Sequence, residues 1–392
     1  MNFGTKYTKN ILNRKSKGED TMKKGSRILA VVLGAVIFMT GCGSQNIPDE
    51  DVNKVQTESV EKETENKPAS DDVQQTSTEE HAKIKVAYHP HITGVGGILN
   101  AIDNGYFEEE NLEVELVQFT SGATELAAMA SGDIDIGYLG VGAHVFAPQG
   151  QCTILALDST DLSGEIMVRA DSGIKSVEDL KGKNVAISAG TTSELVLSMA
   201  LKLNGMEKTD VNMINMDASG KVTAFMSGQI DAISIEAPYT DQIRTDMGEE
   251  NVVTISGSKD FLPDAVFTNS WVTTNKFLEG NEEVIVRFLK AWLKGTEDRY
   301  NNMEDTVQKV ADFINTDYDT AYLVVEKTNW LSNHEMKELV DDGTMMKWYG
   351  TIRDMFLDAE LLDQKYNVPT EEFVDLSCLL YTSPSPRDMR RS

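Results

Sequence analysis

The stretch that most constrains the fold is Phe119–Ala147, in which two expected strands each end in small residues that open a helix. The first strand covers residues 112–119 and leads into a helix over 123–130, and the second covers 134–138. Small hydroxyl residues at a helix start cap free backbone N–H groups, and the same groups with the helix dipole bind anions. Ligands of open α/β sheets bind beyond the carboxyl ends of the strands. The stretch therefore predicts one wall of a small-molecule site and contains no catalytic motif.

The same arrangement recurs in the second half of the body. A strand predicted over residues 184–188 leads into a helix that begins near Thr192 and ends near residue 203. The segment Ser227–Ala232 (SGQIDA) repeats the pattern of Ser131–Ile136 (SGDIDI), and in each case a strand follows a helix. Strands that alternate with helices predict parallel sheets. The recurrence indicates two lobes built from the same strand–helix–strand units.

The last part of the body is expected to be helical, with no strand after Asn281. Apolar residues at three- and four-residue spacing predict amphipathic helices over residues 282–301, 303–313, 318–327 and 333–361.

A chain of 392 residues is long enough for two lobes. We expect the first lobe to comprise residues 83–163 together with 271–376, and the second to comprise 164–270. The strands that join them are expected near residues 157–167 and 266–274. The pattern thus predicts an α/β protein with parallel-rich sheets, flanking helices and a helical C-terminal part.

The N-terminus has the features of a secretory signal peptide over residues 1–42. Basic residues precede an apolar run over 28–39, which is too short to span a bilayer comfortably. Met39–Cys42 resembles the lipobox of bacterial lipoproteins, with Met39 where Leu is usual. We therefore expect a lipid on Cys42 and a location at the outer face of the cell membrane.

Residues 43–82 are polar, acidic and poor in large apolar side chains, which predicts a disordered tether. Met22 is an alternative start to Met1, because the residues between them add nothing that a signal peptide needs. Residues 377–392 are basic and rich in Ser and Pro, and they resemble translated sequencing-adapter read-through, so we interpret them as a non-native tail.

Composition and motifs exclude several classes of function. The net charge of −27 argues against nucleic acid and against an anionic membrane surface as partners. Cys152 lies in an apolar strand and is expected to be a buried thiol, and no cysteine spacing indicates a disulfide framework or a metal site. No nucleophile elbow or metalloprotease motif is present. We therefore predict a protein that is not an enzyme and needs no cofactor or metal.

Four segments together resemble the substrate-binding proteins of ABC importers, in the branch that binds sulfonates, nitrate, taurine and thiamine pyrimidines. The segments are Asn104–Leu116, Phe119–Gly122, Ala130–Gly140 and Val177–Ala186. The resemblance covers about residues 83–375 and implies a two-lobed periplasmic-binding-protein-like fold of type II. It also implies that a monomer captures a solute by lobe closure and delivers it to a permease with its ATPase.

The candidate ligand-binding residues lie at the predicted strand ends, where hydroxyls, backbone N–H groups, imidazoles and one carboxylate could contact a solute. They are His89, His91, Thr93, Ser121, Gly122, Thr124, Gly140, Val141, Thr191, Thr192, Ser193, Glu236, Tyr239 and Asn269. Two hydroxyl-rich turns that face each other across a cleft would bind a sulfonate or carboxylate without a lysine.

The ligand stays open at this point. A taurine-like alkylsulfonate suits the hydroxyl turns, and Glu236 could bind its amine. An aminopyrimidine thiamine precursor is the second possibility, although its binders usually have an aromatic residue where this chain has His89. Nitrate or bicarbonate is third. An enzymatic alternative, a pyrimidine synthase of this fold, is disfavoured because the chain lacks its Cys-rich motif. An extracellular sensing module is a further alternative.

Overall fold

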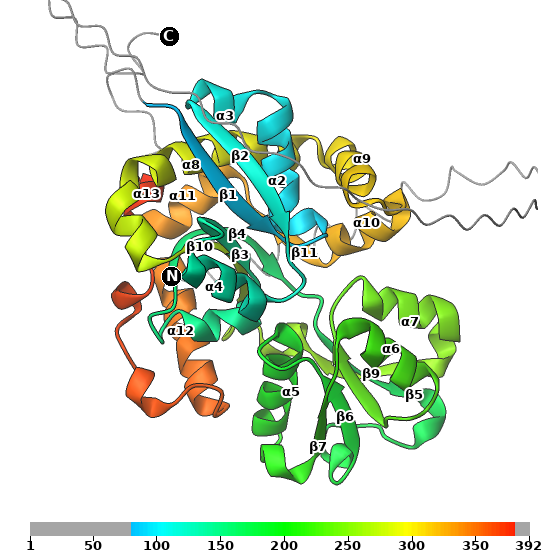
Figure 1. Cartoon of the computed structure of the whole chain (residues 1–392). Helices are drawn as coiled ribbons and strands as arrows, with labels where there is room; N and C mark the ends of the chain where they lie inside the picture. The colour runs from blue at the N-terminus through cyan, green and yellow to red at the C-terminus, as the bar shows by residue number, and fades with distance from the viewer. Residues whose placement is uncertain (1–79, 381–392) are drawn as a thin grey trace, which may run out of the picture. The chain divides into compact units, whose positions relative to one another are not determined.

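The computed structural model describes residues 80–380, and their strands form two sheets. The signal peptide, the lipidation of Cys42, most of the tether and residues 381–392 of the tail lie outside this range, so those expectations stay untested. We call the part built on the first sheet lobe I and the part built on the second sheet lobe II (Figure 1).

The sheet of lobe I has the strand order β11-β4-β10-β3-β1-β2. Its strands are β1 (Ala82–Tyr88), β2 (Leu112–Gln118), β3 (Ile136–Leu139), β4 (Thr153–Asp161), β10 (Phe267–Thr273) and β11 (Thr328–Trp330). β1 pairs in parallel with β2 and β3, whereas β10 is antiparallel to β3 and β4. Every residue of β3 and β10 is buried, because helices cover both faces of the sheet centre.

The sheet of lobe II has the order β7-β6-β8-β5-β9. Its strands are β5 (Glu165–Arg169), β6 (Asn184–Ile187), β7 (Asn212–Asn215), β8 (Ala232–Ile235) and β9 (Val252–Gly257). β6 pairs in parallel with β7 and β8, and β5 is antiparallel to β8 and β9. The chain thus crosses from lobe I to lobe II after β4 and returns before β10.

Helices surround both sheets (Figure 1). Lobe I has α2 (Ile92–Asp103), α3 (Tyr106–Glu109), α4 (Gly122–Ser131), the 3₁₀ helix η1 (Val141–Phe146), α8 (Asn275–Asn301), α9 (Met303–Ile314), α10 (Tyr318–Glu326), α11 (Asn333–Asp341), α12 (Thr344–Asp358) and α13 (Ser377–Leu380). Lobe II has α5 (Thr192–Leu203), α6 (Ala218–Met226) and α7 (Tyr239–Met247). Within residues 80–380, no helix is both long and apolar enough to cross a bilayer.

The repeated sequence pattern has the same structural role in both lobes, as predicted. Asp135 accepts a hydrogen bond at 2.8 Å from the backbone N–H of Lys85 on β1, and its own N–H donates back to Lys85 O. Asp231 does the same with Asn184 on β6, at 2.9 Å. Each aspartate therefore fixes the start of a new strand against an earlier parallel strand of its lobe, β1 in lobe I and β6 in lobe II.

Several expected elements differ in the structure. The three-residue strand β11 lies in the part expected to be purely helical, where it adds to the edge of β4. The helix expected over residues 333–361 is divided into α11 and α12, because Gly343 adopts a left-handed conformation with φ 75°. The helix expected after the second strand of the Phe119–Ala147 stretch is only a 3₁₀ turn, η1.

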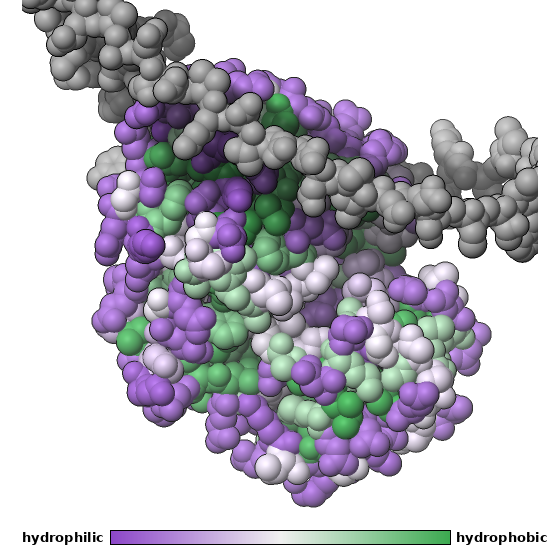
Figure 2. Space-filling model, in the orientation of Figure 1, coloured by the Kyte–Doolittle hydropathy of each residue, from purple (hydrophilic) through white to green (hydrophobic). Residues whose placement is uncertain are grey.

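Hydrophilic side chains cover much of the face shown in Figure 2, in keeping with the net charge of −27. In the described part, few large apolar side chains are exposed, and they are scattered over both lobes.

Candidate functional site

The end of β1 places two histidines beside a buried carboxylate. His89 Nε2 lies 2.9 Å from Glu125 Oε2, and the Glu125 side chain is fully buried on α4. The second carboxylate oxygen of Glu125 accepts a hydrogen bond from the Tyr138 N–H. Burial raises the pKa of Glu125, although His89 opposes this shift. The buried Glu125 carboxylate therefore holds one side of the His89 ring, while part of the ring stays exposed.

His91 stacks beside His89, with ring centroids 5.8 Å apart. Its Nδ1 lies 2.5 Å from the hydroxyl of Thr93, which is itself buried. Burial lowers the pKa of His91 to about 3, with a further lowering by His89. Thr93 thus orients the imidazole and has little surface left for a ligand, whereas His91 is half-buried.

The turn after β2 leaves helix α4 without a side-chain cap. Ser121 occupies the N-cap position but makes no capping hydrogen bond with its side chain, so the first-turn N–H groups are not satisfied by it. Thr124 is exposed, and its hydroxyl donates to Ser121 O at 2.9 Å. Gly122 is buried, and a Cβ atom there would lie 2.6 Å from Ala143 Cβ. Ser121 is thus the residue of this turn that is free to contact a solute.

The turn after β3 touches lobe II directly. A Cβ atom on Gly142 would lie 2.0 Å from the carbonyl carbon of Thr191. A Cβ atom on Gly140 would lie 3.5 Å from Asn269 Oδ1 and 3.7 Å from Thr192 Oγ1. The segment in contact with Thr191 and Thr192 is therefore the glycine turn Gly140–Gly142, with no space between the two. That the hydroxyl turns at Ser121 and Thr191 face each other across a cleft stays a prediction.

Three predicted residues near this contact are buried. Val141 is 1% exposed and belongs to the core of lobe I. Asn269 is 8% exposed and donates from Nδ2 to Ser159 Oγ at 3.3 Å. Thr192 is 9% exposed. These three residues therefore lie within the protein, next to the contact between the lobes.

The turn at the start of α5 includes a buried lysine that the sequence analysis did not identify. Lys221 is 1% exposed, and its Nζ donates to Ser193 Oγ at 3.1 Å and to Ser234 O at 2.9 Å. Thr191 caps the helix by accepting from the Ser193 N–H. Burial lowers the pKa of Lys221, and the Glu236 carboxylate opposes this shift. A lysine amine therefore lies behind the second hydroxyl turn, where no basic group was expected.

Lys221 lies in helix α6, far from the turn in sequence, and only the packing of α6 on β8 brings it there. A lysine in an otherwise small and apolar helical segment, Ala218–Met226, is the only signal the sequence offered.

The end of β8 carries Glu236, which is half-buried. Burial raises its pKa, Lys221 opposes this, and the carboxylate of Asp161 on β4 raises it further. The next residue, Ala237, packs against the lobe I cluster that includes Tyr88 and Trp330. Tyr239 is half-buried at the start of α7 and packs against the core of lobe II.

The structure thus separates the predicted site residues into two sets. Those that retain exposed surface at the strand ends are His89, His91, Ser121, Gly140, Thr191, Glu236 and Tyr239. Those whose side chains or backbone pack within the protein are Thr93, Gly122, Val141, Thr192, Ser193 and Asn269, while Thr124 faces outward. Within residues 80–380, no group of three His, Cys, Asp or Glu side chains is placed to hold a metal ion.

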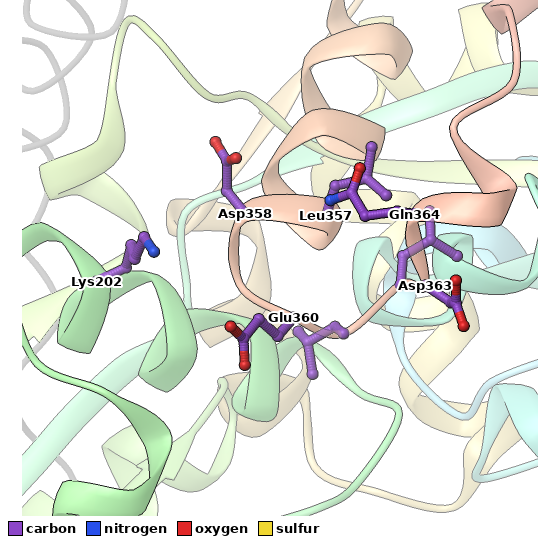
Figure 3. A pocket seen from close by; sticks show the side chains of 8 residues that line it. Lys202, Leu357, Asp358, Glu360, Asp363 and Gln364 are labelled. Atoms are coloured by element: carbon purple, nitrogen blue, oxygen red, sulfur yellow. The ribbon is translucent and has the colours of Figure 1, made fainter.

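A separate pocket lies where α5 approaches the loop after α12 (Figure 3). Lys202 on α5 and Asp358, Glu360 and Asp363 on the other side line it, and none of the predicted ligand residues does. Lys208 Nζ donates to Glu360 O at 3.0 Å in the same region. This pocket belongs to a second place where the lobes meet.

The family follows from a comparison with known proteins. Residues 92–306, more than half of the chain, match the family model described as NMT1/THI5 like. The chain belongs to the NMT1/THI5-like family. A Brucella abortus relative, named only as a binding protein, is 30% identical over 274 residues, which cover 70% of this chain and 85% of the relative. The taurine-binding periplasmic protein of Escherichia coli is 28% identical over 48% of this chain and 58% of its own length.

Solved structures show the same fold for this NMT1/THI5-like protein. The periplasmic aliphatic sulphonate-binding protein SsuA of Escherichia coli is 19% identical with a TM-score of 0.59, over 75% of this chain and 92% of that chain. The ligand-binding component of an ABC-type import system from Staphylococcus aureus is 17% identical with a TM-score of 0.61, over 77% and 99%. The predicted two-lobed α/β fold is therefore confirmed.

One neighbour shows that this fold also occurs in enzymes. The desulfurization enzyme DszB is 11% identical with a TM-score of 0.53, over 76% of this chain and 98% of that chain. The relatives above 25% identity are nevertheless named as binding proteins, in agreement with a binding role for this NMT1/THI5-like chain.

Proposed function

We propose that the chain is the extracytoplasmic solute-binding component of an ABC importer, which captures a small organic anion or zwitterion between its lobes. The observation that carries the proposal is the meeting of strand-end turns from both sheets, with Gly140 and Gly142 of lobe I against Thr191 and Thr192 of lobe II. Ligands of α/β sheets bind at such strand ends. The names of the relatives support the same role.

We propose a taurine-like alkylsulfonate as the ligand. The first turn of α4 offers backbone N–H groups that Ser121 leaves uncapped, and Lys221 adds a positive charge behind the α5 turn. Both features stabilise an anionic group. Burial, and after it the Asp161 carboxylate, raise the pKa of Glu236, and two neighbouring carboxylates favour an ammonium group on the same ligand. A zwitterion carries both an anionic group and an ammonium group, so it suits both of these features.

An aminopyrimidine is the second candidate. The raised pKa of Glu236 makes a protonated carboxyl group available as a hydrogen-bond donor to a ring nitrogen, and the stacked rings of His89 and His91 offer a flat surface. Nitrate or bicarbonate would contact only the part of the site that binds an anionic group.

The remaining parts of the proposal concern the setting of the protein. We propose that Cys42 carries a lipid that holds a monomer at the outer face of the cell membrane, and that a permease and its ATPase receive the solute. We also propose that the chain does not catalyse a reaction. The lobe boundaries near residues 164 and 270 remain part of the same proposal.

Isothermal titration with a matched ligand pair tests the assignment. Taurine and ethanesulfonate share the sulfonate but differ in the amine, so taurine should bind the wild-type protein more tightly. Glu236→Gln should weaken taurine binding by about 10- to 100-fold, the range expected for a hydrogen bond to a charged group, and leave ethanesulfonate unchanged. Binding of an aminopyrimidine alone would favour the second candidate. Equal loss for both sulfonates would contradict the role given to Glu236.

A further inference from the structure

One lysine of lobe I reaches across to three polar groups of lobe II. Lys327 follows helix α10, and its Nζ binds the Asp241 carboxylate and the Thr240 hydroxyl, the latter at 2.8 Å. It also lies 3.7 Å from Glu165 Oε1. The side chains of Lys327, Asp241 and Glu165 are 16%, 20% and 15% exposed. This interlobe contact is therefore largely withdrawn from solvent, where ion pairs are less screened.

The backbone of Lys327 is fixed on its own side. Its carbonyl accepts a hydrogen bond at 2.9 Å from the Leu162 N–H, in the segment where the chain leaves β4 for lobe II. The next residue, Thr328, pairs with Asp161 in the sheet of lobe I. The stem of Lys327 thus starts from a rigid base.

The acceptors on lobe II are fixed as well. Arg244 binds the Glu165 carboxylate and donates to Thr254 Oγ1 at 2.8 Å, so it holds Glu165 to β9. Thr240 and Asp241 lie in the first turn of α7, which begins at Tyr239, three residues after Glu236. The contact with Lys327 therefore determines where the Glu236 turn lies relative to lobe I.

We propose that Lys327 is a positioning residue that holds the ligand-binding turn of lobe II against lobe I and thereby sets the affinity for the solute. The inference rests on the proposed function for the identity of the ligand, but not for the effect on the lobes. A ligand that binds between closed lobes has an apparent affinity that falls with the fraction of closed molecules. Loss of the lysine lowers the fraction of closed molecules, although it removes no group that contacts the solute.

The experiment measures lobe separation and binding in the same variants. Spin labels on Ala127→Cys in α4 and Leu203→Cys in α5, both at exposed positions, report the distance between lobes in the full chain carrying Cys42→Ser. The remaining cysteines, Cys152 and Cys378, are buried. Lys327→Met should shift the distance distribution toward longer values and weaken taurine binding about tenfold. Asp241→Asn, which removes the same ion pair from the lobe II side, should change both readouts in the same direction.

Lys337→Met is the matched control, because Lys337 pairs with Asp341 inside lobe I and both side chains are about half exposed. It should change neither readout. An unchanged distance distribution in Lys327→Met would overturn the inference, and so would an unchanged distribution in a folded Asp241→Asn variant. If wild-type protein does not bind taurine, the ligand assignment fails, while the distance measurement still decides the role of Lys327.

Discussion

At the scale of single residues, the contact at Gly142 shows how little room the lobes leave between them. Its neighbours across the contact are backbone atoms of Thr191 and Thr192, which cannot rotate away as a side chain could. Glycine is required here by close approach of two chain segments, since no left-handed conformation is involved.

Gly142→Ala should therefore push the lobes apart and weaken solute binding by at least about tenfold, while the thermal midpoint changes little because each lobe keeps its own core. Titration calorimetry with the proposed ligand, taurine, measures the affinity of each variant. Gly280→Ala is the control, because a Cβ there meets no atom within 4 Å. Equal affinities for wild type and Gly142→Ala would show that the lobes do not bind solute in this closed arrangement.

A buried histidine predicts how stability depends on pH. His144 is 2% exposed, its Nδ1 lies 3.2 Å from Thr268 Oγ1, and its Nε2 has no partner in the described part. Burial lowers its pKa from 6.5 to about 3. Between those values the unfolded chain binds a proton that the folded protein does not, so this group costs stability as pH falls below about 6.5.

The loss from His144 should reach about 2 kcal/mol at pH 5 relative to pH 7.5, and His144→Asn should make the decline shallower by that amount. Denaturant unfolding at several pH values measures the slope. The exposed His334→Asn is the control and should leave the slope unchanged. Identical slopes for wild type and His144→Asn would contradict the assignment.

At the scale of elements, one buried ion pair connects α8, β4 and the loop that begins α2. Asp158 Oδ1 lies 2.9 Å from Arg299 Nη1, and both side chains are at most 1% exposed. Asp158 Oδ2 accepts from the Gly94 N–H and from the Tyr138 hydroxyl, each at 3.2 Å. Arg299 also lies over the Trp330 ring at 4.5 Å. The ion pair therefore stabilises the part of lobe I that lies next to His89 and His91.

Arg299→Met should lower the free energy of unfolding by about 3–5 kcal/mol, because it leaves the Asp158 carboxylate buried without its counter-charge. Urea unfolding measures the change. Lys337→Met removes an exposed pair and should cost at most about 1 kcal/mol. If Arg299→Met lowered the free energy of unfolding no more than Lys337→Met does, the donors of Tyr138 and Gly94 alone would satisfy the Asp158 carboxylate.

At the scale of the whole molecule, the two lobes differ in how the chain builds them. All strands of the lobe II sheet lie between Glu165 and Gly257, whereas the lobe I sheet takes strands from both sides of that segment. Lobe II is therefore continuous in sequence and lobe I is not.

A fragment of residues 163–259 should fold by itself with a cooperative thermal transition, since its sheet and its buried Lys221 network are complete. Residues 80–163 alone should not fold, because β3 and β4 would lack β10 between them. Circular dichroism on heating distinguishes the two. A fragment 163–259 that melts without cooperativity would show that lobe II depends on its contacts with lobe I.

The amino-acid sequence was sufficient for the local features: the alternation of strands and helices, the small-residue turns at strand ends, and the recurrence of the SGxID segment in both lobes. These depend on residues that are close along the chain, where spacing and capping chemistry operate. They were enough to predict the two-lobed fold, whereas the ligand-binding residues stay a prediction.

Which of those residues meet depends on the packing of the folded chain. The approach of Gly142 to Thr191, the lysine behind Ser193 and the reach of Lys327 into lobe II all join segments distant in sequence. β11 was missed because three residues are too few to show a period, and it exists because β4 offers an edge. Burial and pairing across the two lobes depend on packing of the whole chain, and no local pattern encodes them.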